Sequence, residues 1–168
     1  KYNLPYDATV FIFVANKITS NPWKNFKLML ESLQYLGKES KNKIFFLCVG
    51  EVNKPIYQNN FSCIFLEHIE DQQIMNELYN SADYYIHLAK ADTFPNTILE
   101  AQASGLPVFA NPICGIIEQI VDKETGWFIK SESPRKIAHK IKDIISENDI
   151  EKSRINCRKH ILNKFCVK

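Results

Sequence analysis

The sequence predicts an α/β fold, namely a doubly wound, parallel, six-stranded sheet with helices on both faces. Three observations support this prediction. Short apolar runs, typical of strands buried on both faces, alternate with segments of helical period along the whole chain. The length of 168 residues is that of one ordinary domain, and no segment repeats, so residues 1–168 are expected to form a single domain. Hydrophobic residues make up 45% of the chain, which excludes disorder.

Three strands and two helices are predicted in the first half of the chain. The strands are the apolar runs at residues 10–14, 43–49 and 61–66. Asn21 and Pro22 have the pattern of an N-cap followed by proline at the first helical position, and Gly37 is expected to end that helix. Residues 51–60 are polar and are expected to form a loop, after which Asp71 caps the second helix.

The second half is predicted to contribute three more strands and four helices. The strands are expected at residues 83–88, 106–110 and 126–129. The helices are expected at residues 96–103 and 115–121, from Ser133-Pro134 onward, and at 149–165. In such sheets ligands bind beyond the carboxyl ends of the strands, which directs attention to the loops at 15–25, 67–71, 89–96 and 111–115.

Charge is distributed unevenly along the chain. The net charge is +2, from 21 basic and 19 acidic side chains, but residues 151–168 hold six basic groups and one acidic group. That basic helix is either a solvated face or a surface for an acidic partner, such as another domain or the anionic inner face of the cell membrane. Nucleic acid is not expected as a partner, because no recognised binding motif accompanies the charge.

The cysteines and histidines indicate neither a disulfide framework nor a metal site. The five cysteines are odd in number and form no C-x-x-C, so free thiols in a reduced, cytoplasmic protein are expected. The four histidines are scattered, and no metal is expected. No apolar run is long enough to span a membrane. The first residue is not Met, and the chain is interpreted as a piece of a longer protein.

Well-known nucleotide-binding and catalytic signatures are missing. The sequence has no G-x-G-x-x-G, no P-loop and no G-x-S-x-G elbow. The first predicted strand runs into Ala15-Asn16-Lys17, whereas a response-regulator receiver needs acidic residues there. The functional residues must therefore lie in another motif.

The most informative stretch is residues 90–108, KADTFPNTILEAQASGLPV. A loop that holds Asp92 leads into a helix beginning at Asn96, whose free N–H groups and dipole suit a phosphate. Asn96 and Thr97 add polar side chains there, and Glu100 lies about one turn further on the same face. Two carboxylates beside an anion site suit a ligand with hydroxyl groups on both sides of a phosphate, as in a nucleotide sugar. Taken singly, each acid is more typical of a structural role, Asp92 in a turn and Glu100 in a first helical turn, and only their joint placement favours a ligand site.

This stretch resembles the signature of glycosyltransferases of the GT-B fold, family 4, also called group 1. The signature has an acid, seven residues and a Glu, followed by Ala-x-Ala-x-Gly-x-Pro-Val, which residues 100–108 match closely. The resemblance continues in Cys114-Gly115 and Glu118, where the family has Gly-Gly-x-x-Glu, and extends from Val10 to about Phe165. It implies the C-terminal, donor-binding domain of a two-domain enzyme, with residues 149–168 leading back to the N-terminal domain.

The resemblance also assigns roles to individual residues. Glu100 matches the acid that holds the nucleotide ribose, and Asp92 matches the acid that faces the transferred sugar, where the family usually has Glu. These two are the candidate catalytic residues. The candidate substrate-binding residues are the turn beside the diphosphate and two lysines near the first strand: Phe94, Pro95, Asn96, Thr97, Lys17 and Lys24. Lys24 matches the family's phosphate-binding Lys, whereas Lys17 only substitutes for an Arg that has no clean match.

Three polar aromatic residues next to this stretch are expected to have structural roles. Tyr84, Tyr85 and His87 are interpreted as strand residues and not as platforms for the base. The sequence does not identify the base.

The resemblance implies a retaining transfer of a hexose from a nucleoside diphosphate sugar to a glycan or lipid-linked acceptor, in polysaccharide synthesis. No cofactor and no metal are expected. The acceptor would bind mainly in the N-terminal domain, so the chain alone is expected to bind nucleotide without transferring sugar. Two alternatives stay open. One is a GT-B nucleotide-sugar epimerase, which lacks this acid-x7-acid segment, and the other is a nucleotide-binding module without transfer activity.

Overall fold

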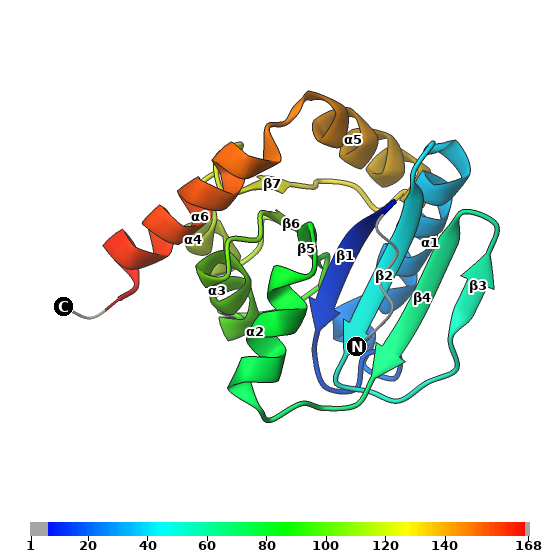
Figure 1. Cartoon of the computed structure of the whole chain (residues 1–168), viewed down its shortest axis with the longest axis horizontal. Helices are drawn as coiled ribbons and strands as arrows, with labels where there is room; N and C mark the ends of the chain where they lie inside the picture. Colours follow the sequence, from blue (N-terminus) through cyan, green and yellow to red (C-terminus); the bar gives the residue numbers. More distant parts are fainter. Residues whose placement is uncertain (1–6, 167–168) are drawn as a thin grey trace.

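The computed structural model describes residues 7–166, which form a seven-stranded sheet with helices on both faces (Figure 1). The strands lie in the order β3-β4-β2-β1-β5-β6-β7. Neighbouring strands are parallel throughout, except for the antiparallel pair β3–β4. The strands are β1 (Ala8–Val14), β2 (Lys43–Val49), β3 (Ile56–Gln58), β4 (Phe61–Leu66), β5 (Tyr84–His87), β6 (Val108–Ala110) and β7 (Gly126–Phe128).

The helices cover the sheet in two layers. They are α1 (Phe26–Glu39), α2 (Gln72–Asn80), α3 (Asn96–Ala103), α4 (Ile116–Gln119), α5 (Pro134–Glu147) and α6 (Ile150–Lys164), with a 3-10 helix, η1 (Pro22–Lys24). The crossovers β1–β2 and β5–β6 run in opposite directions along the sheet, so right-handed connections place α1 and α3 on opposite faces. Helix α1 packs with α5, and α3 packs with α6. The predicted doubly wound α/β fold is thus confirmed.

The number of strands is the main correction to the sequence analysis. The seventh strand, β3, lies within residues 51–60, which were expected to form only a loop. It forms a hairpin with β4 in which Gln58 pairs with Phe61, so Asn59 and Asn60 make the turn. Asparagine tolerates the backbone conformations of tight turns. The strand has only three residues and lies at the sheet edge, so it leaves no pattern of buried positions in the sequence.

The first helix also differs from its prediction at both ends. Asn21 caps only η1, because Asn25 takes a left-handed conformation (φ 53°) and α1 begins after it, at Phe26. Gly37 does not end α1 but is buried inside it, two residues before its last residue. A Cβ atom on Gly37 would lie 3.1 Å from the Asn60 carbonyl oxygen. The glycine therefore allows α1 to pack closely against the start of β4.

The basic helix α6 is anchored to its own domain by two of its arginines. Arg154 donates to the Ala82 carbonyl oxygen at 2.8 Å, and its side chain is only 17% exposed. Arg158 donates to the Ser104 carbonyl oxygen at 3.1 Å. Arg154 was expected, as part of the basic helix, to face another domain or lipid, but its guanidinium is instead held against Ala82 and Asp83, just before β5.

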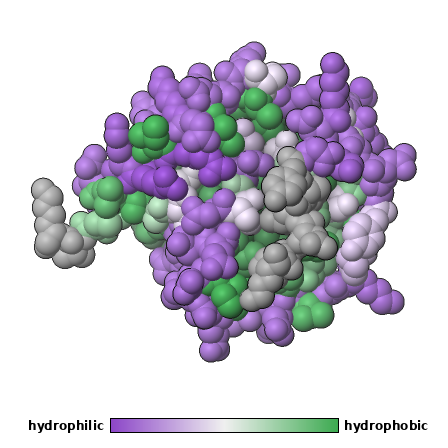
Figure 2. Space-filling view, in the orientation of Figure 1, coloured by the Kyte–Doolittle hydropathy of each residue, from purple (hydrophilic) through white to green (hydrophobic). Residues whose placement is uncertain are grey.

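Most of the face shown in Figure 2 is hydrophilic, with small separated apolar patches. Within residues 7–166, no helix is both long and apolar enough to cross a membrane. All five cysteines are free, as predicted. Cys48 Sγ and Cys63 Sγ lie 3.8 Å apart on neighbouring strands, and burial raises the pKa of the Cys48 thiol.

Candidate functional site

The strand order defines one crevice in which a ligand is expected. The chain leaves β1 towards β2 and β4, then returns to the other side of β1 as β5. In doubly wound folds, ligands bind where the order reverses, beyond the carboxyl ends of the strands. Two of the loops predicted to be functional meet there. Lys90 N donates to the Trp23 carbonyl oxygen at 2.8 Å, and Asn25 Nδ2 donates to the Leu88 carbonyl oxygen at 2.9 Å.

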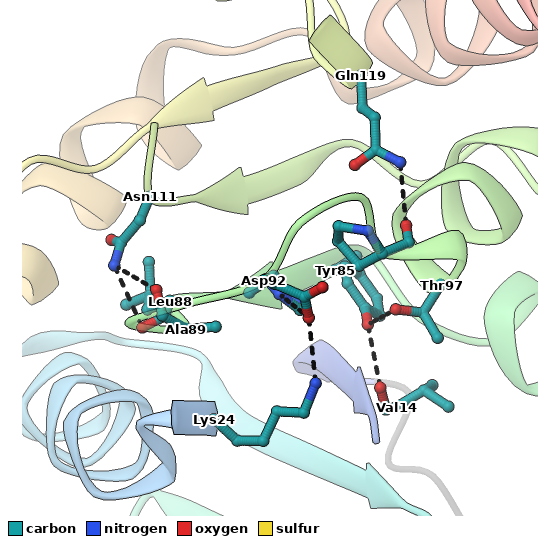
Figure 3. A network of polar contacts seen from close by, with 11 residues as sticks. Val14, Lys24, Tyr85, Leu88, Ala89, Asp92, Thr97, Asn111 and Gln119 are labelled. Atoms are coloured by element: carbon teal, nitrogen blue, oxygen red, sulfur yellow. Dashed lines mark hydrogen bonds and ion pairs between the residues drawn. The ribbon is translucent and has the colours of Figure 1, made fainter. Parts of the chain in front are cut away.

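Lys24 and Asp92, from these two loops, form an ion pair at the crevice (Figure 3). Lys24 Nζ lies 3.1 Å from Asp92 Oδ2, and both side chains are largely buried. His87 Nε2 lies 3.4 Å from the same oxygen, at the end of β5. The contact with His87 and the ammonium of Lys24 lower the pKa of Asp92 to about 2. Burial lowers the pKa of His87, so its ring is neutral and Asp92 is ionised at pH 7.

Helix α3 begins at Asn96 as predicted, and Pro95 is its N-cap residue. No side chain caps this end, so the first N–H groups of the helix stay available for an anion. Asn96 is exposed, whereas Thr97 is half-buried and its Oγ1 accepts a hydrogen bond of 2.8 Å from Tyr85. Pro95 is buried, and its carbonyl oxygen accepts a 3.1 Å hydrogen bond from Gln119, which fixes the turn (Figure 3).

Glu100 lies on α3, one turn beyond Asn96 and Thr97, and is exposed. Its Oε2 accepts a 3.0 Å hydrogen bond from the hydroxyl group of Tyr79, which belongs to α2. Burial raises the pKa of Tyr79, and the charge of Glu100 acts in the same direction. The hydroxyl group is therefore a donor at any physiological pH, and it holds one oxygen of Glu100.

The remaining two predicted residues differ in how they are placed. Phe94 is 39% exposed and packs edge-on against Phe165 at the end of α6. Gly115 lies against it, and its N–H donates to the Thr93 carbonyl oxygen. Lys17 follows β1 in a left-handed conformation (φ 53°) and is exposed. Within residues 7–166, its side chain forms no hydrogen bond or ion pair, unlike that of Lys24.

Among the described residues, no cluster of metal-binding side chains marks this crevice. No group of three or more His, Cys, Asp or Glu side chains in residues 7–166 could hold a metal ion. A hollow of about 500 Å³ lies between α1 and the β3–β4 hairpin, lined by residues such as Gln34, Lys38 and Asn59. It contains none of the predicted site residues. We place the site at the crevice because the charged groups and the free helix end meet there.

The fold and these groups point to a class: a doubly wound domain whose switch point holds an ion pair and an uncapped helix N-terminus. The family model "Glycosyl transferases group 1" matches residues 1–161, and the chain belongs to this family. It is 28% identical over 118 residues to the capsular polysaccharide biosynthesis glycosyltransferase CapM of Staphylococcus aureus. That alignment covers 70% of this chain and 30% of CapM, so the chain spans less than a third of this relative.

Solved structures show the same fold. The C-terminal domain of the group 1 family protein LpcC from Francisella tularensis superposes with a TM-score of 0.74 at 20% identity, covering 96% of this chain and 87% of that one. Anabaena Alr3699/HepE in complex with UDP and glucose gives 0.73 at 16% identity, covering 95% of this chain and 45% of HepE. At these identities the likeness shows the fold alone, which is the Rossmann-like domain of GT-B glycosyltransferases.

Three residues that touch the site were not predicted to do so from the sequence: Tyr79, Tyr85 and His87. Tyr85 and His87 were placed correctly in a strand, but their contacts with Thr97 and Asp92 were not predicted. One available signal was the spacing of Tyr85 and His87, because two polar aromatics two residues apart share one face of a strand. Tyr79 left no such signal, because it reaches Glu100 from a different helix.

Proposed function

We propose that this chain is the donor-binding, C-terminal half of a retaining glycosyltransferase. It binds a nucleoside diphosphate sugar, from which the complete enzyme transfers a hexose to a glycan or lipid-linked acceptor. Family membership supports transfer over the epimerase alternative. The names of two similar proteins support the substrate class, since HepE is described with UDP and glucose and CapM with capsular polysaccharide biosynthesis.

The observation that carries this proposal is the placement of Lys24, Asp92 and the free end of α3 at one crevice. The ammonium of Lys24 has three N–H donors, so it can keep Asp92 and also bind a phosphate oxygen. The N-terminus of α3 adds partial positive charge on the same side. When the bond between the sugar C1 and the phosphate oxygen breaks, the diphosphate leaves with the electron pair, and both groups stabilise that charge.

The two acids have separate tasks in this proposal. Glu100 binds the ribose hydroxyl groups through the carboxylate oxygen that Tyr79 does not hold. Asp92 faces the transferred sugar. No metal ion or cofactor is part of the proposal. The acceptor and further catalytic groups belong to the rest of the protein, so the chain alone binds nucleotide weakly and transfers nothing.

Calorimetric titration of this chain with UDP, GDP, ADP and the matching nucleotide sugars tests the proposal. Glu100→Gln is expected to weaken binding of the nucleoside diphosphate and of its sugar alike, by about ten- to a hundredfold. Asp92→Asn should leave the nucleoside diphosphate nearly unaffected and weaken only the sugar. Glu132→Gln, an exposed acid in the loop before α5, is the matched control and should change nothing.

Two results would contradict the proposal in different ways. If Glu100→Gln binds nucleotide as tightly as the parent does, the ribose assignment is wrong. If the parent binds none of the nucleotides, the donor-binding function itself fails. Transfer by the full-length protein, lost in Asp92→Asn, separates an enzyme from a nucleotide-binding module without activity. The module is favoured by two features: Asp92 where the family usually has Glu, and the exposed Lys17 in place of a phosphate-binding Arg.

A further inference from the structure

Three buried polar aromatic residues lie side by side beneath the candidate site. Tyr79, Tyr85 and His87 are each no more than 2% exposed. The ring centroids of Tyr79 and Tyr85 are 6.3 Å apart, and the rings of Tyr85 and His87 stack at 6.2 Å with an angle of 17° between their planes. Phe13 of β1 packs against both Tyr85 and His87. We call Tyr79, Tyr85 and His87 the aromatic row.

Each member of the aromatic row contacts a different residue of the site. The Tyr79 hydroxyl group donates to Glu100 at 3.0 Å, and the Tyr85 hydroxyl group donates to Thr97 at 2.8 Å. His87 Nε2 lies 3.4 Å from Asp92 Oδ2. The members of the row, from Tyr79 through Tyr85 to His87, therefore follow the same order as their partners Glu100, Thr97 and Asp92.

We propose that Tyr79, Tyr85 and His87 are positioning residues that fix Glu100, Thr97 and Asp92 in their donor-binding arrangement. This inference rests on the proposed function of that site. At the two carboxylates, the contact involves one oxygen and leaves the other for a ligand, and the Thr97 hydroxyl group, which accepts from Tyr85, still has its own proton to donate. The row holds Oε2 of Glu100 and Oδ2 of Asp92, and within residues 7–166 the second oxygen of each carboxylate accepts no hydrogen bond.

His87 shows most clearly that the row is more than core packing. Neither of its ring nitrogens makes a well-aligned hydrogen bond within residues 7–166, although the ring is buried. A buried polar group without a good partner destabilises a fold, so a leucine or phenylalanine would suit a purely structural position better. At this position the histidine also supports an aspartate where the family's signature has the longer glutamate. Together with Lys24 it keeps that shorter acid ionised and in place.

The tyrosines are tested by removing single hydroxyl groups and titrating the chain with UDP and GDP. Tyr79→Phe is expected to weaken nucleotide binding about five- to tenfold, because Glu100 loses a charge-assisted hydrogen bond. Tyr85→Phe should have a smaller effect, about threefold, because Thr97 is neutral. Tyr84→Phe is the matched control, since Tyr84 is equally buried but packs with Phe11 and Phe109 on the other face of β5. All three variants should keep similar melting temperatures.

A ligand-free measurement keeps this inference separate from the proposed function. In the free chain, the Asp92 carboxyl group faces His87 from β5 and Lys24 from η1, and NMR titration can follow its pKa. His87→Phe should raise this pKa from about 2, whereas His87→Gln, which keeps a donor near the Nε2 position, should restore it. A crystal structure of free Tyr79→Phe should show the Glu100 carboxylate displaced.

Each possible outcome tests a separate part of the inference. If Tyr79→Phe binds nucleotide like Tyr84→Phe, or if its Glu100 stays in place, the tyrosines are not positioning residues. If His87→Phe leaves the Asp92 pKa unchanged, His87 is only a core residue. If the parent binds neither UDP nor GDP but both ligand-free changes occur, the proposed donor fails while the row still positions the three side chains.

Discussion

The two halves of the sheet are built from different kinds of side chain. In β1 and β2, the buried residues are aliphatic or phenylalanine, apart from Cys48. In β5, three of the four buried residues are Tyr84, Tyr85 and His87. Strands β1 and β5, which lie on either side of the switch point, both have buried side chains, but of these two only β5 brings polar side-chain atoms into the core.

This difference separates the part that stabilises the domain from the part that arranges the site. The β1–β2 pair gains its stability from apolar burial, which is not directional. The polar groups of β5 are costly to bury, and two of them face site residues: Tyr85 donates to Thr97, and His87 lies 3.4 Å from Asp92 without a well-aligned hydrogen bond. Substitutions in β1–β2 should therefore change stability, and those of Tyr85 and His87 in β5 should change binding.

The largest expected effect is on the apolar half. Phe46 of β2 is completely buried and packs against Phe26. Phe46→Ala should lower the free energy of unfolding by about 3–5 kcal/mol, measured by urea denaturation. Because that variant can fail to fold, Phe46→Leu serves as a milder test, with a loss of about 1 kcal/mol. A Phe46→Ala chain as stable as His87→Phe would contradict the division between the halves.

Replacing either of two glycines with positive φ by alanine should cause a loss of stability of intermediate size, and the two substitutions form a matched comparison. A Cβ on Gly50, which follows β2, would lie 2.3 Å from the Ala15 carbonyl oxygen, a backbone atom. A Cβ on Gly105, which precedes β6, would lie 2.9 Å from Nε of Arg158, a side chain that can move. Gly50→Ala should therefore cost about 2–3 kcal/mol and Gly105→Ala about 1 kcal/mol. Equal losses in thermal unfolding would show that the clash at Gly50 is relieved by backbone movement.

The smallest expected effect is a loss of stability at low pH, and it should come from groups in the β5 half of the sheet. Burial lowers the pKa of His87 below its ordinary 6.5, so the unfolded chain binds a proton that the folded chain does not, and stability falls below pH 6.5. The pKa of Asp92 is lowered from 3.8 to about 2, so its contribution of about 1–2 kcal/mol is complete above pH 4 and disappears as pH falls through 2.

Urea denaturation at a series of pH values checks these two windows. His87→Phe should lose less stability than the parent between pH 7 and pH 5. Asp92→Asn should lose less than the parent between pH 4 and pH 2. Parallel curves for the parent and both variants would show that neither group is linked to folding.

Those parts of the fold that depend on local pattern could be predicted from the sequence. The runs that became β1 and β2 are apolar throughout, and the start of α3 at Asn96 follows from the turn before it. Glu100, Asp92 and Lys24 were predicted from the resemblance to a family, but the side chains that contact them were not. Tyr79 and Glu100 come from different helices, and the pairing of Lys24 with Asp92 joins loops 68 residues apart in sequence. Such contacts follow from the strand order, which no single segment encodes.

The position of β1 between β2 and β5 has a consequence for synthesis on the ribosome. Strand β1 can pair with β2 early, but its other edge must wait until Tyr84 has been added. At ordinary rates of translation the wait after the end of β2 is about 2–7 seconds. During that time an edge formed by Phe11 and Ile12, among the most apolar residues of the chain, is open to pairing with a neighbouring nascent chain. The residue pair that later completes the centre of the sheet, Tyr84 and Tyr85, also closes this apolar edge against pairing with another chain.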